Sequence, residues 1–233
     1  MSLDVDFPIK IIRTDRRKSA SIDVENEVVR VSIPSTLSDQ RVEALITQRM
    51  PWIQSKLDEQ RRATPRRNVE YIDGESISYL GRNYRLKLEH GITKSAKLKN
   101  GKLVVNIPAA RANGRFERYI RTTVEDWYKK QALKHFQAKS ARYGKQIGVT
   151  PKSIDISDFK ARWGSCSPEG DITYHWRVIA ASHRIVDYIV VHELCHLIEH
   201  SHSPRYWQLV ENIMPDYRER REWLKTNGGS LLN

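Results

Sequence analysis

The sequence predicts an α+β fold in which a β-hairpin-rich N-terminal portion precedes a helical portion with a small sheet. Residues 29–34 and 103–108 each alternate like a strand, and each run is followed by a helical segment. Later in the chain, two strand-like runs precede a helical segment that is apolar on almost every face. We expect one domain over residues 10–228, with sub-parts at 8–110 and 111–228.

The first sub-part is predicted to hold two hairpin-then-helix units. The hairpin cues are Glu25-Asn26 and the stronger Asn100-Gly101. The helical segments that follow carry Trp52 and Trp127, so the two units resemble each other. The similarity is short, and both duplication and convergence on a common pattern remain open.

Between these units the chain predicts an exposed link and further strands. Residues 62–67, Arg-Ala-Thr-Pro-Arg-Arg, are typical of a link. Residues 71–88 predict strands that are interrupted at Gly81.

The second sub-part is predicted to begin with a long helix from Arg115 to about Tyr143. Strands are expected over residues 153–163 and 172–180, joined by the turn-like run from Gly164 to Gly170. Ser182 is then a plausible N-cap for a buried helix that reaches about Ile198. Pro215 is expected to end the next helix, and Asn227-Gly228-Gly229 to end the last.

Composition excludes some classes of protein and leaves others open. No apolar run is long enough for a transmembrane helix, and the N-terminus lacks a signal peptide pattern, which predicts the cytoplasm. The two cysteines are expected to be reduced thiols. The net charge of +12 makes a nucleotide or nucleic acid a conceivable partner, although a solvated basic surface is the better interpretation because no recognition signature accompanies the charge. The oligomeric state is not predicted.

Four of the eight histidines lie in one stretch, between His192 and His202. On a helix, His192 and His196 project from the same face, one turn apart, and both can reach one zinc ion. Glu193 lies beside the first of them and can serve as general base toward a zinc-activated water, which is the HExxH arrangement. The alternative is a buried helix whose histidines only satisfy hydrogen bonds, and burial makes that arrangement costly.

A catalytic zinc usually needs a third protein ligand. His200 continues the spacing of four, but on a straight helix it would lie about 12 Å along the axis from His192. His202 precedes Ser203-Pro204, a helix-start signal, and therefore lies in a loop that can fold back over the metal. We favour His202 over His200 and over an acidic residue elsewhere.

Several residues near this stretch are further candidates. Cys166 of the run Arg-Trp-Gly-Ser-Cys could be a nucleophile or a ligand, although a structural turn is the better interpretation. Tyr174, His175 and Arg177 of the preceding strand are candidates for binding substrate or stabilising a transition state.

Three blocks of the sequence resemble the YgjP-like metallopeptidase family, which is related to the SprT-like and WLM zincins. They are ARWGSCS, ITYHWRVI and VDYIVVHELCHLIEHSHSPRYW, and the resemblance covers roughly residues 10 to 225. It implies a zincin-like catalytic core, with zinc on His192, His196 and His202, and Glu193 as the catalytic glutamate. Family members often have Asn where this chain has Ser201 and His175.

The sequence therefore predicts a zinc metallopeptidase that acts on a peptide or protein. Some family members carry the label UTP pyrophosphatase, and a metal-dependent nucleotide pyrophosphatase is the first alternative. A protease that acts at nucleic acid, by analogy with SprT-like proteins, is the second. A domain in which zinc is only structural is a third.

Overall fold

The computed structural model describes residues 5–15, 19–25, 28–62, 69–108, 116–159 and 162–231. The chain divides into two compact units, Met1–Thr64 with Lys225–Asn227, and Pro65–Leu224 with Gly228–Asn233. Each has its own cluster of buried apolar side chains. The predicted link at residues 62–67, apart from Arg62, lies outside the described residues, as do Asn26 and Arg115. The single domain over residues 10–228 stays a prediction.

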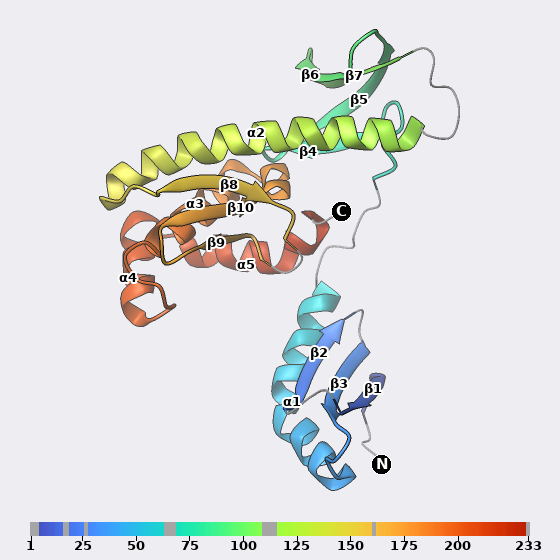
Figure 1. The fold of residues 1–233 in the computed structure, drawn as a ribbon, viewed down its shortest axis with the longest axis vertical. Helices are drawn as coiled ribbons and strands as arrows, with labels where there is room; N and C mark the ends of the chain where they lie inside the picture. The colour runs from blue at the N-terminus through green and yellow to red at the C-terminus, as the bar shows by residue number, and fades with distance from the viewer. Residues whose placement is uncertain are drawn as a thin grey trace. The chain divides into compact units, whose positions relative to one another are not determined.

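The smaller unit is a three-stranded sheet covered by one helix (Figure 1). The sheet has the order β1 (Ile9–Thr14), β3 (Val28–Pro34), β2 (Ser21–Glu25), and the helix is α1 (Asp39–Arg62). The central strand β3 is parallel to β1 and antiparallel to β2. Its alternation places Val29, Val31 and Ile33 in the core of this unit, which confirms the predicted strand.

The larger unit begins with a four-stranded sheet of order β4-β5-β7-β6. Its strands are β4 (Ser76–Tyr79), β5 (Arg82–His90), β6 (Ser95–Lys99) and β7 (Lys102–Ile107). The β6–β7 hairpin turns at Asn100 and Gly101, whose φ angles of 50° and 71° are those of a type I′ turn. The hairpin predicted from the Asn-Gly pair is confirmed.

A 32-residue helix, α2 (Phe116–Ile147), joins the parts of the larger unit. It contacts β6 and β7, and it also contacts β8, α3 and the short helix η1 (Figure 1). The helix is four residues longer at its C-terminal end than the sequence predicts, and Gly148 follows it at a φ of 83°, the conformation that commonly ends a helix.

A small sheet of order β8-β10-β9 lies next in the chain, formed by β8 (Ser153–Ser157), β9 (Gly164–Cys166) and β10 (Asp171–His175). The strand predicted over residues 153–163 ends at Ser157, and two further predictions were wrong here. Residues 164–166 form an edge strand paired with β10, because the turn lies further on, at residues 167–170. Residues 176–180 form the 3-10 helix η1 (Trp176–Ala180), because Val178 and Ile179 are buried consecutively and not alternately.

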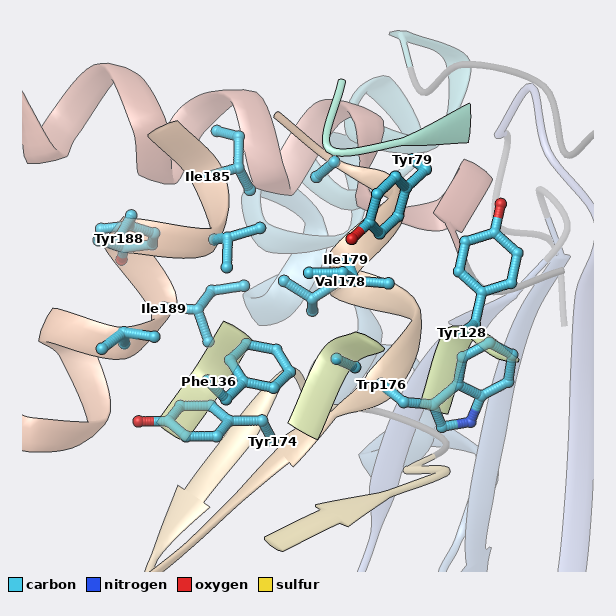
Figure 2. Close-up of a cluster of buried hydrophobic side chains, with 14 of the residues drawn as sticks. Tyr79, Tyr128, Phe136, Tyr174, Trp176, Val178, Ile179, Ile185, Tyr188 and Ile189 are labelled. Atoms are coloured by element: carbon cyan, nitrogen blue, oxygen red, sulfur yellow. The ribbon is translucent and has the colours of Figure 1, made fainter. Parts of the chain in front are cut away.

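The remaining helices are α3 (His183–Cys195), α4 (Pro204–Ile213), α5 (Tyr217–Asn227) and the 3-10 helix η2 (Gly228–Leu231). As predicted, α3 is buried, and Ser182 precedes it at the N-cap position. Figure 2 shows how it is enclosed: Ile185 and Ile189 of α3 lie near Val178 of η1 and the stacked rings of Phe136 and Tyr174. None of the helices in the described part of the chain combines the length and the apolar character needed to cross a bilayer.

The three sheets share one arrangement. In each, a strand pairs in parallel with the second strand of the hairpin that follows it, and a helix comes next. The first sheet is β1-β3-β2, the second contains β5-β7-β6, and the third is β8-β10-β9. The sequence indicated only the first two.

Candidate metal centre

The histidines are brought together by the way α3 ends. Its last residue is Cys195, three residues before the predicted end, and the N–H groups of His196, Leu197 and Ile198 bond to carbonyls three residues back. This tighter turn ends the helix. The Oγ of Ser203 accepts a hydrogen bond from the N–H of Tyr206 at 3.2 Å, and Pro204 begins α4. His202 therefore lies in the loop between two helices, as the sequence predicts.

His192, His196 and His202 each offer a ring nitrogen, and these nitrogens all lie within 4.8 Å of one another. Nε2 of His202 is 3.2 Å from Nε2 of His192. Two imidazole nitrogens at 2.0–2.1 Å from a tetrahedral zinc are about 3.3 Å apart, so this spacing fits the ion. In the described ranges, no other group of three His, Cys, Asp or Glu side chains has this closeness.

Desolvation disfavours the charged form of all three rings. It lowers the pKa of His192 to about 3, with the nearby His196, His202 and Arg221 adding to the effect. Burial also lowers the pKa of His196 and of His202. A neutral imidazole has the free lone pair that a metal needs, so the donor set suits zinc at neutral pH.

Hydrogen bonds orient the rings unequally. Nδ1 of His196 lies 3.1 Å from the carbonyl oxygen of Glu199, which leaves its Nε2 free for the triad. Nδ1 of His192 is buried without a hydrogen-bond partner among the described residues. His192 is held through its backbone instead, because the Tyr206 hydroxyl donates to its carbonyl oxygen at 3.0 Å.

Tyr206 is a residue of the site that the sequence analysis missed. It is fully buried, its ring is stacked on His196 at 4.5 Å between centroids, and it presents an edge to His192 and to His202. The available signal was its place two residues after Pro204, in the first turn of the helix that follows His202. Tyr206 contacts all three histidines and so fixes their mutual positions.

Glu193 lies beside the triad with only 5% of its surface exposed. Burial raises its pKa to about 8, and Arg162 acts in the opposite direction. Gly164 of β9 packs directly on it: a Cβ at Gly164 would lie 2.5 Å from Oε1 of Glu193. The glycine of the Arg-Trp-Gly-Ser-Cys run is therefore required for the close approach of β9 to this carboxylate.

A cavity of about 540 Å³ opens between α3 and β9. The triad and Glu193 line it on the side of α3, and Arg162 to Cys166 together with Pro168 line it on the side of β9. Tyr188, Ile189 and Leu224 complete its wall. The arrangement places a potential metal ion, a buried carboxylate and an edge strand around one space.

His200 and Cys166, the alternative candidates for a metal ligand or a nucleophile, both line the cavity but lie outside the histidine triad. His200 is exposed and lines the cavity, but it is not part of the group of close ring nitrogens. Burial, Glu193 and Asp171 raise the pKa of Cys166 to about 11, so its sulfur is a thiol and not a nucleophilic thiolate. The Cys166 Sγ donates to the carbonyl of Ser167.

Tyr174, His175 and Arg177 do not line the cavity. The Tyr174 hydroxyl lies 3.1 Å from Oγ of Ser140 on α2, and Tyr174 is fully buried. Nδ1 of His175 accepts from the N–H of Arg177 at 3.1 Å, while the guanidinium of Arg177 lies between Glu125 and Asp158. Their direct roles toward substrate stay predictions.

Known proteins that resemble this chain are metallopeptidases. A family model described as "YgjP-like, metallopeptidase domain" matches residues 18–227. A solved structure, the metallopeptidase zymogen of Pyrococcus abyssi abylysin, is similar at 24% identity and a TM-score of 0.37. The similarity covers 39% of this chain and 92% of that chain. No curated protein matches the sequence.

Proposed function

We propose, since the chain belongs to the YgjP-like metallopeptidase family, that it is a zinc-dependent peptidase in which Glu193 is the general base. Family membership implies a metal and a peptide substrate. The observation that carries the finer proposal is the group of three close histidine nitrogens beside a buried glutamate. His192, His196 and His202 would hold the ion.

When bound to these three histidines, the ion would supply Lewis-acid chemistry, which lowers the pKa of a water molecule and polarises the scissile carbonyl. Glu193 takes the proton of the attacking water and later delivers it to the leaving amine. The pKa of Glu193, raised by burial and lowered by Arg162, suits a group that must both accept and donate a proton. Because Gly164 has no side chain, β9 can approach this carboxylate closely.

The substrate is held by β9 in this proposal. Among the described strands β9 pairs only with β10, so the other side of its backbone could take a further strand. All three of its residues, Gly164 to Cys166, line the cavity. An extended peptide can pair with this edge, and the pairing would present the backbone of the peptide to the triad.

The test compares Glu193→Gln with wild type, using an unfolded protein such as casein as substrate. We expect cleavage to fall by about 10²–10⁴-fold, the usual contribution of general base catalysis, with zinc content near one per chain in both proteins. Glu169→Gln, which removes the same charge from an exposed turn outside the cavity, is the control and should cleave normally. Cleavage that survives Glu193→Gln would contradict the proposed role.

The alternative functions are separated in the same experiment. Release of pyrophosphate from UTP by wild type, and its loss in Glu193→Gln, would identify a nucleotide pyrophosphatase at this site. If zinc removal by EDTA unfolds the protein and no peptide is cut, the ion is structural. Peptide cleavage that is restored by adding zinc back to the metal-free protein supports the peptidase.

A further inference from the structure

Four large apolar side chains, those of Trp163, Tyr188, Ile189 and Leu224, line part of the cavity, and we call this part the apolar recess. Tyr188 and Ile189 lie one turn before His192 and Glu193 on α3, and both are buried. Trp163 and Leu224 meet beside Gly228, where an added Cβ would be 2.6 Å from the indole ring and 3.5 Å from Cδ1 of Leu224. The recess therefore presents aromatic and aliphatic surface in the same cavity as Glu193 and the three histidines.

Arg162 introduces a positive charge into the same cavity. It is the only lysine or arginine among the residues that line the cavity, and Glu193 is the only acidic residue there. Its guanidinium lies over the ring of Phe159, 4.8 Å from the centroid, and makes no ion pair with an acidic side chain in the described part of the chain. Such a guanidinium is free to bind a carboxylate through two parallel hydrogen bonds.

We propose that this cavity selects peptides that place a large apolar side chain in the recess and a carboxylate on Arg162. The inference rests on the proposed peptidase function and specifies the substrate class of the same site. A carboxylate is the anion that peptides ordinarily carry. It comes either from the C-terminus, when the apolar residue is the last one, or from an Asp or Glu next to the apolar residue.

Trp163 links the two features. It follows Arg162 in the chain and precedes Gly164, which packs against Glu193. Three consecutive residues therefore supply the cation, one wall of the recess and the backbone that lies against the proposed general base. A residue whose side chain enters the recess therefore has its neighbouring groups within reach of both Arg162 and Glu193. The sequence analysis interpreted this run as a structural turn, and the proposal gives Arg162 and Trp163 a role in selecting substrate.

The experiment measures kcat/KM for two pairs of quenched fluorescent peptides. In the first pair, a C-terminal Phe carries a free carboxylate or an amide. In the second pair, an internal Phe is followed by Glu or by Gln, and the C-terminus is amidated. Each peptide is also made with Ala in place of Phe, and cleavage positions are mapped by mass spectrometry.

We expect wild type to prefer the carboxylate member of at least one pair by about tenfold or more, the usual advantage of a charge-assisted hydrogen bond. Arg162→Gln should remove this preference, and Arg162→Lys should restore part of it because lysine keeps the charge without the paired donors. Arg118→Gln, which removes the same charge from the exposed surface of α2, should leave it unchanged. A preference in the first pair identifies the terminal carboxylate, and one in the second identifies an acidic side chain.

The recess is tested with the Phe and Ala peptides. Wild type should favour Phe by about tenfold or more, as a hydrophobic pocket discriminates between residues that differ by several methylene-sized groups. Leu224→Ala should reduce that ratio, since it removes one wall of the recess. Equal cleavage of acid and amide forms, or a preference that persists in Arg162→Gln, would overturn the proposal.

Failure of this inference is distinguishable from failure of the peptidase proposal. If the amide and Gln peptides are cut by wild type and by Arg162→Gln but not by Glu193→Gln, the proposed peptidase function is supported, whether or not the enzyme prefers a carboxylate. If no peptide is cut, calorimetric binding of the same four peptides to the metal-free protein decides the inference alone. Tighter binding of the carboxylate forms to wild type, lost in Arg162→Gln, supports it, and equal binding contradicts it.

Discussion

At residue 164 a side chain of any size would collide with the carboxylate of Glu193. A methyl group on the Cα of Gly164 would lie 2.5 Å from Oε1, which is shorter than any real contact, so one of the two groups must move. β9 is paired with β10, and α3 is buried, so the glutamate side chain moves more easily than either backbone. A single methyl group at this position therefore displaces the proposed general base.

We expect Gly164→Ala to lower kcat for peptide cleavage by about 10²-fold, the cost of moving a catalytic group by roughly 1 Å. Metal content should stay near that of wild type, because the three atoms nearest to an added Cβ all belong to Glu193 and not to the triad. Steady-state kinetics together with metal analysis measure both quantities. Ser165→Ala, at the next position of β9, is the control, and full activity in Gly164→Ala would contradict the assigned contact.

The third ligand is decided by comparing two nearby histidines. His202 belongs to the group of close nitrogens and His200 does not, although both line the cavity. We expect His202→Ala to weaken zinc binding by more than the roughly 10–100-fold lost when a residue that only supports a ligand is removed. His200→Ala should retain zinc. Competition with a chromogenic chelator gives both affinities, and the opposite order would exclude His202.

Single residues could be predicted from the sequence where the motif itself carries the chemistry. His192, Glu193 and His196 follow from spacing on a helix, and His202 follows from the helix-start signal after it. Tyr206 and the Gly164 contact could not be predicted, because each depends on which surfaces meet across the fold. No periodicity within one segment contains that information.

At the scale of elements, the loop between α3 and α4 determines where His202 lies. The loop is closed at one end by the tight last turn of α3 and at the other by Ser203, whose Oγ caps α4. The cap orients the first turn of α4, which carries Tyr206 against the histidines. The start of a neighbouring helix therefore forms part of the metal centre.

Ser203→Ala removes this cap and should lower the free energy of unfolding by about 1 kcal/mol, the usual value of an N-cap hydrogen bond. We also expect weaker zinc binding, because the loop that carries His202 loses one of its two fixed ends. Thermal unfolding of the metal-free protein separates the two effects. Ser203→Asp, which can accept the same hydrogen bond, should recover both, and zinc affinity equal to wild type in Ser203→Ala would contradict the role of the cap.

Most elements were predictable, and the two errors have a common cause. Alternation and caps identify β3, β7, α2 and α3 because each is long enough for several periods. β9 has three residues and η1 has five, too few for a periodic signal. β9 becomes a strand because β10 offers it a partner, and that pairing is a property of the tertiary structure.

For the whole molecule, every residue of the proposed site belongs to the larger unit, including the triad, Glu193 and the residues that line the cavity. Its hydrophobic core is also separate from the core of the smaller unit. The proposed chemistry therefore does not require any residue of the β1–β3 sheet or of α1.

We expect a fragment of residues 69–233 to fold and to bind one zinc ion with an affinity within about tenfold of the full chain, because its core and ligands are complete. Circular dichroism and chelator competition measure the two properties. The same fragment carrying His196→Ala is the control for specific binding. A fragment that unfolds, or that folds without binding zinc, would show that the site depends on the smaller unit.

The arrangement that the three sheets share has a consequence for the order in which the protein forms. In each sheet the hairpin joins strands that are neighbours in the sequence, so its contacts are local and are expected to form first. The parallel pairing with the earlier strand spans a larger sequence separation and is expected to form later. For the sheet of β1 to β3, all three strands and the covering helix are complete by residue 62. That unit can therefore assemble on the ribosome well before the histidines of the triad have been translated.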